Sequence, residues 1–283
     1  MPALDRDALP TMAAFSLTGR VAIVTGAAGL LGRQHCRALA DAGATVVATD
    51  LAEEACAGVA AELAAEGRRD VHPFAADITD AASLGRLRDA ALRLGDHIDV
   101  LINNAALNDR FEDAAAAAAL SRFESYPVER FRAALDVNVT GTFLACQVLG
   151  AEMARRGRGS IVNIASTYGM VGPDQRIYRG EHGEQRFWKS AVYPASKGAV
   201  LAFTRYLATT WAERGVRVNS LSPGGVAQSG QDTVFVAHYS RRTPLARMAE
   251  AHELRGAIVF LASDASSYMT GANLVVDGGW TAW

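Results

Sequence analysis

The chain has 283 residues, of which 50% are hydrophobic and 20% are charged, and its formal net charge is −2. This balance is typical of a water-soluble globular protein with a sizeable core. The lack of basic blocks argues against nucleic acid as a partner. No apolar stretch approaches the roughly 20 residues that a membrane helix needs, so no membrane partner is expected.

The first 16 residues have the pattern of a loose leader, because charges and Pro10 interrupt them and no continuous apolar signal region is present. The cysteines at positions 36, 56 and 146 lie in apolar segments, which predicts reduced core residues and no disulfide framework. The six histidines show no ligand spacing, so no metal site is predicted. We expect a cytoplasmic protein.

The first predicted unit is a strand, a glycine-rich turn and a helix. Residues 20–24 form a short apolar run typical of a buried strand, and 31–42 have the pattern of a helix that Gly43 ends. Glycines between a strand and a helix let the backbone approach a phosphate, and the helix N-terminus supplies N–H donors. The predicted phosphate contacts are Gly26, Gly29, Leu31 and Gly32.

A second predicted strand, 44–50, ends at Asp50, 18 residues after the last glycine. An acid near this spacing binds the ribose hydroxyls of adenosine. Its carboxylate would repel a 2′-phosphate, and the next residues, Leu51 and Ala52, offer no cation to bind one. Asp50 and Leu51 therefore predict NAD as the cofactor. The alternative is an acid that only caps the next helix.

Strands and helices continue to alternate. Further strands are predicted over 71–76, 97–102, 159–165, 217–222 and 273–279, and helices over 53–66, 81–94, 128–156, 193–214 and 249–262. This order predicts an α/β fold with one doubly wound parallel sheet of about seven strands, helices on both faces and a single domain over 17–283. The stretch 109–127 is irregular, either a short helix or a mobile flap, and 226–247 is polar with one short helix at most.

Two polar residues stand out along this pattern. Asn138 lies inside a predicted helix between two valines, where asparagine is unfavourable, so it is either a satisfied core amide or a functional kink. Ser166 ends the strand over 159–165, a position where serine is most often a cap.

Tyr193 and Lys197 are four residues apart, on one face of a helix that begins near Pro194. A phenol ordinarily ionises near pH ~10, and an ammonium one turn away lowers that pKa. The pair could therefore exchange a proton with a substrate oxygen. Only two of the 28 basic residues are lysines, Lys189 and Lys197, which hints at a need for a compact ammonium. The alternative is a solvated pair on a surface helix.

Taken in order, these features resemble the short-chain dehydrogenase/reductase family over about residues 17–279. The positions that carry the resemblance are the loop 25–32, Asp77, Asn103-Asn104-Ala105, Asn138, Ser166, Tyr193, Lys197, Pro223-Gly224 and Asp277-Gly278-Gly279. The resemblance implies a Rossmann fold and an NAD-dependent oxidoreductase that moves a hydride between the nicotinamide and a secondary alcohol or ketone. It also implies a homodimer or homotetramer, packed through the helices of Asn138 and Tyr193 and the last helix–strand unit.

The resemblance also implies residue roles. Tyr193 would be the acid/base, Lys197 would bind the nicotinamide ribose and lower the tyrosine pKa, and Ser166 would hydrogen-bond the substrate oxygen. Asn138 would hold a water that relays protons to Lys197. The remaining implied cofactor contacts are Asp77, Ile78, Asn104, Ala105, Pro223, Gly224 and Val226.

The sequence departs from the family pattern at three places. The glycine spacing is that of the larger, sugar-nucleotide-modifying branch, with Leu30 where the middle glycine would be, and Ala106 replaces a usual glycine. Tyr193 lies 27 residues after Ser166, about twice the usual family distance, because of an insertion near 173–190.

We hypothesise that this insertion is a lid over the site. Arg176 and Arg179 suit bidentate binding of a carboxylate or phosphate, and together with Tyr168 they are the candidate substrate contacts. The substrate would then be a polar small molecule such as a sugar, polyol, sugar acid or sugar-nucleotide-like compound. The alternative is a solvated, self-neutralising surface loop.

Two other functions are kept open. The first is a reductase of carrier-bound or fatty 3-oxo substrates, against which the NAD preference and the polar insertion argue. The second is a Rossmann-type protein that senses dinucleotides without catalysis, which would have no need of Ser166, Tyr193 and Lys197 together.

Overall fold

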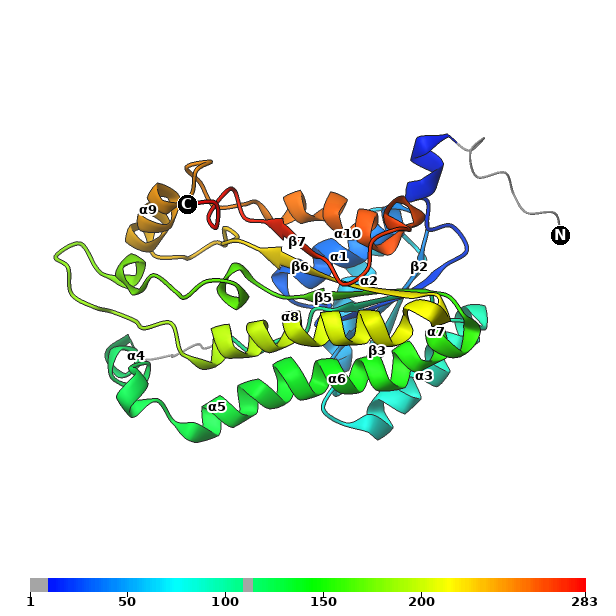
Figure 1. Ribbon diagram of the computed structural model, residues 1–283, viewed down its shortest axis with the longest axis horizontal. Helices are drawn as coiled ribbons and strands as arrows, with labels where there is room; N and C mark the ends of the chain where they lie inside the picture. The colour runs from blue at the N-terminus through cyan, green and yellow to red at the C-terminus, as the bar shows by residue number, and fades with distance from the viewer. Residues whose placement is uncertain (1–9, 109–113) are drawn as a thin grey trace.

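The computed structural model describes residues 10–108 and 114–283 and contains one seven-stranded sheet at its centre (Figure 1). The strand order is β3-β2-β1-β4-β5-β6-β7, and every neighbouring pair is parallel. The predicted doubly wound parallel sheet is therefore confirmed. The strands are β1 (Val21–Thr25), β2 (Thr45–Asp50), β3 (Val71–Ala75), β4 (Val100–Asn103), β5 (Gly159–Ile164), β6 (Val216–Pro223) and β7 (Asn273–Val276).

Helices cover both faces of the sheet (Figure 1). One face carries α1 (Leu30–Asp41), α2 (Glu53–Ala65) and α10 (Arg255–Ala262). The other carries α3 (Ala81–Gly95), α8 (Val192–Trp211) and one long helix made of α5 (Val128–Leu135), α6 (Thr142–Ala145) and α7 (Ala151–Arg156). Two π-helical segments, Asp136–Gly141 and Cys146–Gly150, join the parts of the long helix. The short helices α4 (Ala114–Leu120) and α9 (Thr233–Arg242) lie at one end of the molecule.

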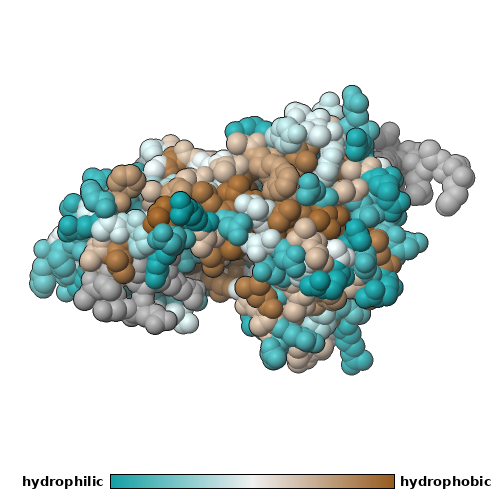
Figure 2. Space-filling view, turned by 90° about the horizontal axis from the view of Figure 1, so that it is seen from below, coloured by the Kyte–Doolittle hydropathy of each residue, from teal (hydrophilic) through white to brown (hydrophobic). Residues whose placement is uncertain are grey.

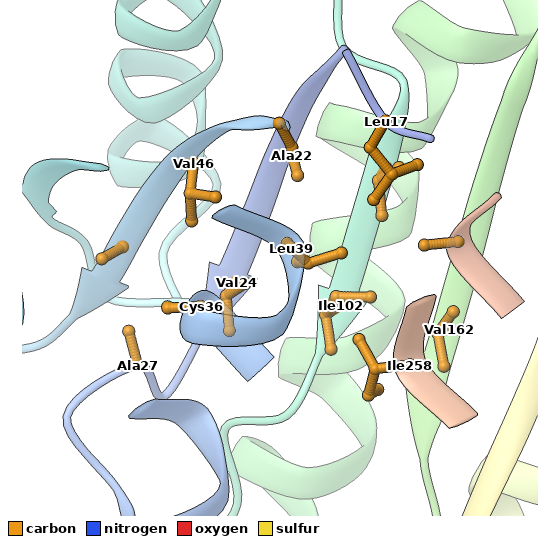
Figure 3. Packing of buried hydrophobic residues seen from close by; sticks show 14 of the residues in the cluster. Leu17, Ala22, Val24, Ala27, Cys36, Leu39, Val46, Ile102, Val162 and Ile258 are labelled. Carbon is orange, nitrogen blue, oxygen red and sulfur yellow. The ribbon is translucent and has the colours of Figure 1, made fainter. Parts of the chain in front are cut away.

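The hydrophobic core lies on both faces of the central strands. The continuous apolar runs of these strands predict burial on both faces. Every residue of β1 and β5 is buried. Figure 3 shows the α1 side of this core, where Cys36 and Leu39 of α1 and Ile258 of α10 lie against the strand residues Ala22, Val24 and Ile102. The alternate β1 residues, Val21 and Ile23, pack on the opposite face. All three cysteines are buried and free, as predicted.

The predicted loose leader is partly ordered. Thr11–Phe15 forms a 3₁₀ turn, the Phe15 ring lies 6.4 Å from that of Phe260 on α10, and Leu17 is fully buried. These apolar contacts hold the segment on the core, while residues 1–9 of the predicted leader lie outside the described residues. In the irregular stretch 109–127 the predicted short helix is present as α4, and 109–113 lie outside the described residues.

The long helix corrects the expectation that no stretch of the chain is long and apolar enough to cross a membrane. By length and composition alone, Val128–Arg156 could cross a membrane. This is weak evidence, because a buried core helix of a water-soluble protein passes the same test. In this structure 44% of the most apolar window of the helix is buried, and Leu149 and Met153 pack against the sheet.

His35 gives the fold a pH dependence. It lies in α1, is fully buried, and in the described part of the chain neither ring nitrogen has a hydrogen-bond partner. Burial lowers the pKa of His35 to about 3, whereas an unfolded histidine titrates near pH ~6.5. Between these values the unfolded chain binds more protons, so stability is lost as the pH falls below about 6.5.

We expect His35 to contribute up to about 1.4 kcal/mol of lost unfolding free energy per pH unit in that window. Urea denaturation across the acidic range measures this slope, and other acidic groups contribute to it as well. The informative quantity is therefore the difference in this slope between the parent and His35→Leu, which has no ring to protonate. Equal slopes in the two proteins would show that His35 is not responsible.

Candidate active site

A cavity of about 500 Å³ opens at the carboxyl ends of the strands, on both sides of the point between β1 and β4 where the strand order reverses. Crevices at such a point are the usual ligand sites of open α/β sheets. The predicted site residues that line it are Gly26, Gly29, Leu31, Asp50, Leu51, Asp77, Ile78, Asn104, Ala105, Ser166, Tyr193, Lys197, Pro223, Gly224 and Val226. Those outside its lining are Gly32, Asn138, Tyr168, Arg176 and Arg179.

The glycine turn forms one end of the cavity. Gly26 has a φ of +64°, and a Cβ there would lie 2.7 Å from the Cα of Ala105. The side chain of Asn104 holds the turn by donating to the carbonyl oxygens of Thr25 (3.0 Å) and Gly26 (2.9 Å). Helix α1 begins four residues later, at Leu30. This bare backbone turn at a helix N-terminus fits the pyrophosphate of a dinucleotide.

Gly32 of α1 packs closely against the backbone of the glycine turn. A Cβ at this position would lie 2.7 Å from the Cα of Ala27 and closer still to the carbonyl oxygen of Gly26. Gly32 therefore lets α1 pack against the turn, although it does not itself line the cavity.

Asp50 ends β2 and faces the same end of the cavity. Its carboxylate accepts hydrogen bonds from the backbone N–H groups of Ala28 (3.0 Å) and Leu51 (2.9 Å). The next helix, α2, has Ala52 as its N-cap with no side-chain cap bond, so Asp50 is not the helix cap of the alternative interpretation. Arg33, on the adjoining turn of α1, is paired with Glu62.

The opposite end of the cavity holds Ser166, Tyr193 and Lys197. Helix α8 begins at Val192, one residue before the predicted start, and places the tyrosine and lysine one turn apart. Lys197 is buried, and its Nζ donates to the carbonyl oxygen of Ile164 at 2.7 Å. Burial, with a smaller contribution from the charge of Lys189, lowers the pKa of Lys197 to about 8.

The pKa of Tyr193 does not follow the simple expectation. Lys197 was expected to lower it, but burial raises it, and a hydrogen bond with Ser166 acts in the opposite direction. The Nζ of Lys197 lies 5.9 Å from the centre of the Tyr193 ring. Desolvation of the phenolate is therefore the largest influence on this pKa in the structure.

Ser166 lies two residues after the end of β5 and has two structural roles. Its Oγ accepts a hydrogen bond from the N–H of Tyr168 (3.2 Å) and so caps the turn Thr167–Gly169. The same residue lines the cavity. The turn packs directly on α8, because a Cβ at Gly169 would lie 2.8 Å from the backbone of Lys197.

Asn138 lies in the π-helical segment of the long helix and is buried. Its side chain accepts a hydrogen bond from the N–H of Leu107 (2.7 Å) and donates to the Leu107 carbonyl (3.0 Å) and to the Ser196 hydroxyl (3.1 Å). It is thus both a satisfied core amide and part of a departure from α-helical geometry. It ties the loop after β4 to the residue before Lys197, and its role in a proton relay stays a prediction.

A family model described as enoyl-(acyl carrier protein) reductase matches residues 26–281. The chain belongs to the short-chain dehydrogenase/reductase family.

Known members of the family match almost the whole chain. A D-threitol dehydrogenase of Mycolicibacterium smegmatis is 37% identical over 272 residues, which cover 94% of this chain and 95% of that protein. A galactitol 2-dehydrogenase (L-tagatose-forming) of Cereibacter sphaeroides is 36% identical, covering 95% and 98%. The crystal structure of a gluconate 5-dehydrogenase from Burkholderia cenocepacia, in complex with NADP and tartrate, is 30% identical with a TM-score of 0.83, covering 97% and 100%.

The insertion of this family member does not bring the two candidate arginines, Arg176 and Arg179, to the cavity. Arg176 is 71% exposed and pairs with Asp174 at 2.8 Å, while Arg179 donates to Gln185 at 3.3 Å. Both line a separate hollow between the insertion and α9. The pairing of Arg176 with Asp174 agrees with the self-neutralising alternative, because neighbouring charges within the insertion satisfy each other.

An aromatic cluster beside Tyr193 was not predicted. Its members come from segments up to 112 residues apart and are Tyr168, Tyr178, Phe235, Tyr239 and Trp280. The rings of Tyr239 and Trp280 stack at 4.2 Å, and Tyr168 contacts both Trp280 and Tyr193 edge to face at 6.5 Å. Trp280 is almost fully buried in this cluster, whereas Trp283, at the end of the chain, is 70% exposed.

The insertion does reach the site through Lys189, the second lysine of the chain. Its Nζ lies 4.0 Å from the centre of the Tyr193 ring. The sequence carried one signal for this residue, its rarity among 28 basic residues, but no spacing rule connected it with the tyrosine.

Proposed function

We propose that this protein is an NAD-dependent dehydrogenase that interconverts a secondary alcohol of a polyol, sugar or sugar acid and the corresponding ketone. The proposal is carried by one observation: Ser166, Tyr193 and Lys197 meet at one end of a cavity whose other end is the glycine turn. The names of the relatives support the substrate class, because threitol and galactitol are polyols and gluconate is a sugar acid. A carrier-bound substrate and a purely sensory role have less support.

The residues of the cavity divide the chemistry between them. A bound nicotinamide dinucleotide supplies the hydride acceptor. Tyr193 as phenolate accepts the proton of the substrate hydroxyl, and Ser166 hydrogen-bonds the same oxygen and holds it at the phenol. Lys197 keeps an ammonium near the phenol and favours its ionised form. In the direction of ketone reduction, Tyr193 returns the proton to the carbonyl oxygen.

We propose NAD as the preferred cofactor because of the groups around Asp50. A carboxylate at this position accepts hydrogen bonds from ribose hydroxyls and repels a 2′-phosphate. The neighbouring Leu51 carries no charge, and Arg33 is already paired with Glu62. The NADP complex of the gluconate 5-dehydrogenase is the reason to test this point directly.

Replacing Asp50 by serine together with Leu51→Arg is expected to reverse the preference. Loss of the carboxylate removes hydrogen bonds to the ribose worth about 1.5–3 kcal/mol, so kcat/KM with NAD should fall on the order of 10- to 100-fold. The arginine supplies a cation for the 2′-phosphate, so kcat/KM with NADP should rise. Steady-state kinetics with each cofactor measure the ratio of kcat/KM with NAD to kcat/KM with NADP.

A matched control is Asp89→Ser on α3, whose acid pairs with Arg88 on the surface away from the cavity. This variant should leave the ratio of kcat/KM with NAD to kcat/KM with NADP unchanged. A parent enzyme that already prefers NADP would contradict the proposed cofactor.

The substrate class is tested by a panel of secondary alcohols with cofactor reduction as the readout. Polyols, aldonic acids, simple cyclic alcohols and carrier-bound 3-hydroxyacyl compounds form its arms. We expect the highest kcat/KM among the polyols and sugar acids. Preferential turnover of acyl compounds would overturn the proposed class, and no turnover at all would favour the sensory alternative.

We also propose a homo-oligomer, a dimer or tetramer, that packs through the long helix and α8. Figure 2 shows this side of the molecule, with apolar side chains gathered across its middle. Phe143 of the long helix remains 43% exposed and lies 6.0 Å from the ring of Phe203 on α8. Exposed large apolar side chains on adjacent helices suit a protein interface. Sedimentation equilibrium that finds only monomer would contradict this.

A further inference from the structure

The backbone of Lys189 is held firmly at the end of the insertion, three residues before α8 begins at Val192. The side-chain carbonyl of Gln175 accepts from the N–H of Lys189 (2.8 Å), and its amide donates to the Lys189 carbonyl (2.9 Å). Gln185 in turn donates to the backbone carbonyls of Gln175 and Phe187, each at 2.7 Å. These hydrogen bonds fix the position of the Lys189 backbone, from which its side chain extends.

The side chain then runs to Tyr193 from outside the cavity. Lys189 is only 9% exposed, and its Nζ is nearer to the centre of the Tyr193 ring (4.0 Å) than the Nζ of Lys197 is (5.9 Å). The Nζ also donates to the side-chain oxygen of Asn108, which lines the cavity, whereas Lys189 itself does not. The ammonium therefore contacts the tyrosine and has no place on the wall that a substrate would touch.

We propose that Lys189 is a positioning residue of this active site, whose ammonium lies on the face of the Tyr193 ring and stabilises the phenolate relative to the neutral phenol. The proposal rests on the acid–base role proposed for Tyr193. A cation on a ring face is attracted by the electrons of a neutral ring. It is attracted more strongly by the net charge of a phenolate, particularly where water is excluded.

Two ammonium groups thus lie near one phenol, and they belong to the only two lysines of the chain. Each ammonium repels the other, and the charge of Lys189 helps to lower the pKa of Lys197. A phenolate close to both of them offsets this repulsion. The pair therefore favours the ionised tyrosine more than either lysine would alone.

The other titratable groups that face Tyr193 do not replace this cation. Three phenols approach it from neighbouring elements, those of Tyr168, Tyr178 and Tyr239. Burial raises the pKa of each well above its usual range, so they stay neutral. Asp174, whose charge also acts on Tyr168, is paired with Arg176. Among the described residues, the charged groups that contact the Tyr193 ring are Lys189 and Lys197.

The test is a titration of tyrosinate absorbance in NAD-saturated protein without substrate. Lys189→Met removes the cation and keeps the length of the side chain, whereas Lys189→Arg keeps the charge. Each protein is compared with the same protein carrying Tyr193→Phe, so that the difference reports Tyr193 alone. We expect Lys189→Met to raise the pKa of Tyr193 by about one unit or more, and Lys189→Arg to stay near the parent. The acidic limb of the kcat/KM profile for alcohol oxidation should move with it.

Two results would overturn the proposal. One is an unchanged Tyr193 titration in Lys189→Met, including the case in which only the KM for anionic substrates rises, since that would make Lys189 a substrate contact. The other is an equal shift in the Met and Arg variants, which would point to packing and not to charge. Because absorbance needs no turnover, these results are separate from the failure of Tyr193 as the acid/base. If Lys189→Met does not fold, Asn108→Leu, which removes the amide that holds the ammonium, should raise the same pKa, and an unchanged pKa there overturns the proposal.

Discussion

Replacing Tyr193 by phenylalanine is expected to lower kcat by about 10²- to 10⁴-fold, the usual contribution of a positioned acid/base. The variant removes one oxygen atom and keeps the ring, so the edge-to-face contact with Tyr168 and the contact with Lys189 remain. Binding of NAD at the glycine turn and Asp50 should therefore persist. Steady-state cofactor reduction with the best substrate of the panel measures the loss, and quenching of tryptophan fluorescence by NAD measures the binding.

A matched control lies on the same helix. Tyr206 of α8 is 65% exposed, and Tyr206→Phe removes a phenol oxygen away from the cavity. It should leave kcat unchanged. A Tyr193→Phe protein as active as the parent would mean that another group moves the proton, and the mechanism proposed above would be wrong.

The cofactor end of the site could be predicted because its signals are local. The glycines from 26 to 32 lie within one strand–turn–helix unit, and Asp50 ends the next strand of the sheet. A parallel sheet then brings the carboxyl ends of its strands to one edge, whatever the loops do. The sequence therefore placed both features at one cavity, in which the structure finds them.

The contacts of the insertion could not be predicted from local signals, because they depend on how the insertion folds back across the sheet. Its charge pattern suggested that the arginines face the substrate, yet the chain turns them towards α9, and the stacking of Tyr178 on Phe235 at 5.3 Å holds that arrangement. Lys189 reaches Tyr193 because Gln175, fourteen residues earlier, binds its backbone. Neither contact has a sequence period that could reveal it.

Asn138 shows a third situation, in which the sequence narrows the alternatives without choosing between them. An asparagine inside a helix indicates a special partner, but the partner here is the backbone of Leu107, on a loop 31 residues away. Asn138 also lies in a π-helical segment of the long helix. Only the folded structure reveals that both interpretations, the satisfied amide and the irregular helix, apply together.

Replacing Gly32 by alanine is expected to disable the cofactor site. The new Cβ would lie 2.7 Å from the Cα of Ala27 and closer to the carbonyl oxygen of Gly26, and both are backbone atoms that cannot rotate away. Either α1 or the turn must shift, which should lower the unfolding free energy by about 3 kcal/mol. The shift also moves the N–H groups at the start of α1, so affinity for NAD should fall on the order of 10²-fold.

Calorimetric titration with NAD and urea denaturation measure the two effects separately. The control is Gly58→Ala in α2, where a Cβ would meet nothing within 4 Å. Because alanine is the better helix former, this variant should gain about 0.5–1 kcal/mol of unfolding free energy and bind NAD as the parent does. The two substitutions add the same methyl group, so opposite outcomes would locate the effect in the turn. Unchanged NAD affinity in Gly32→Ala would show that the cofactor does not depend on this turn, which would contradict the site at its cofactor end.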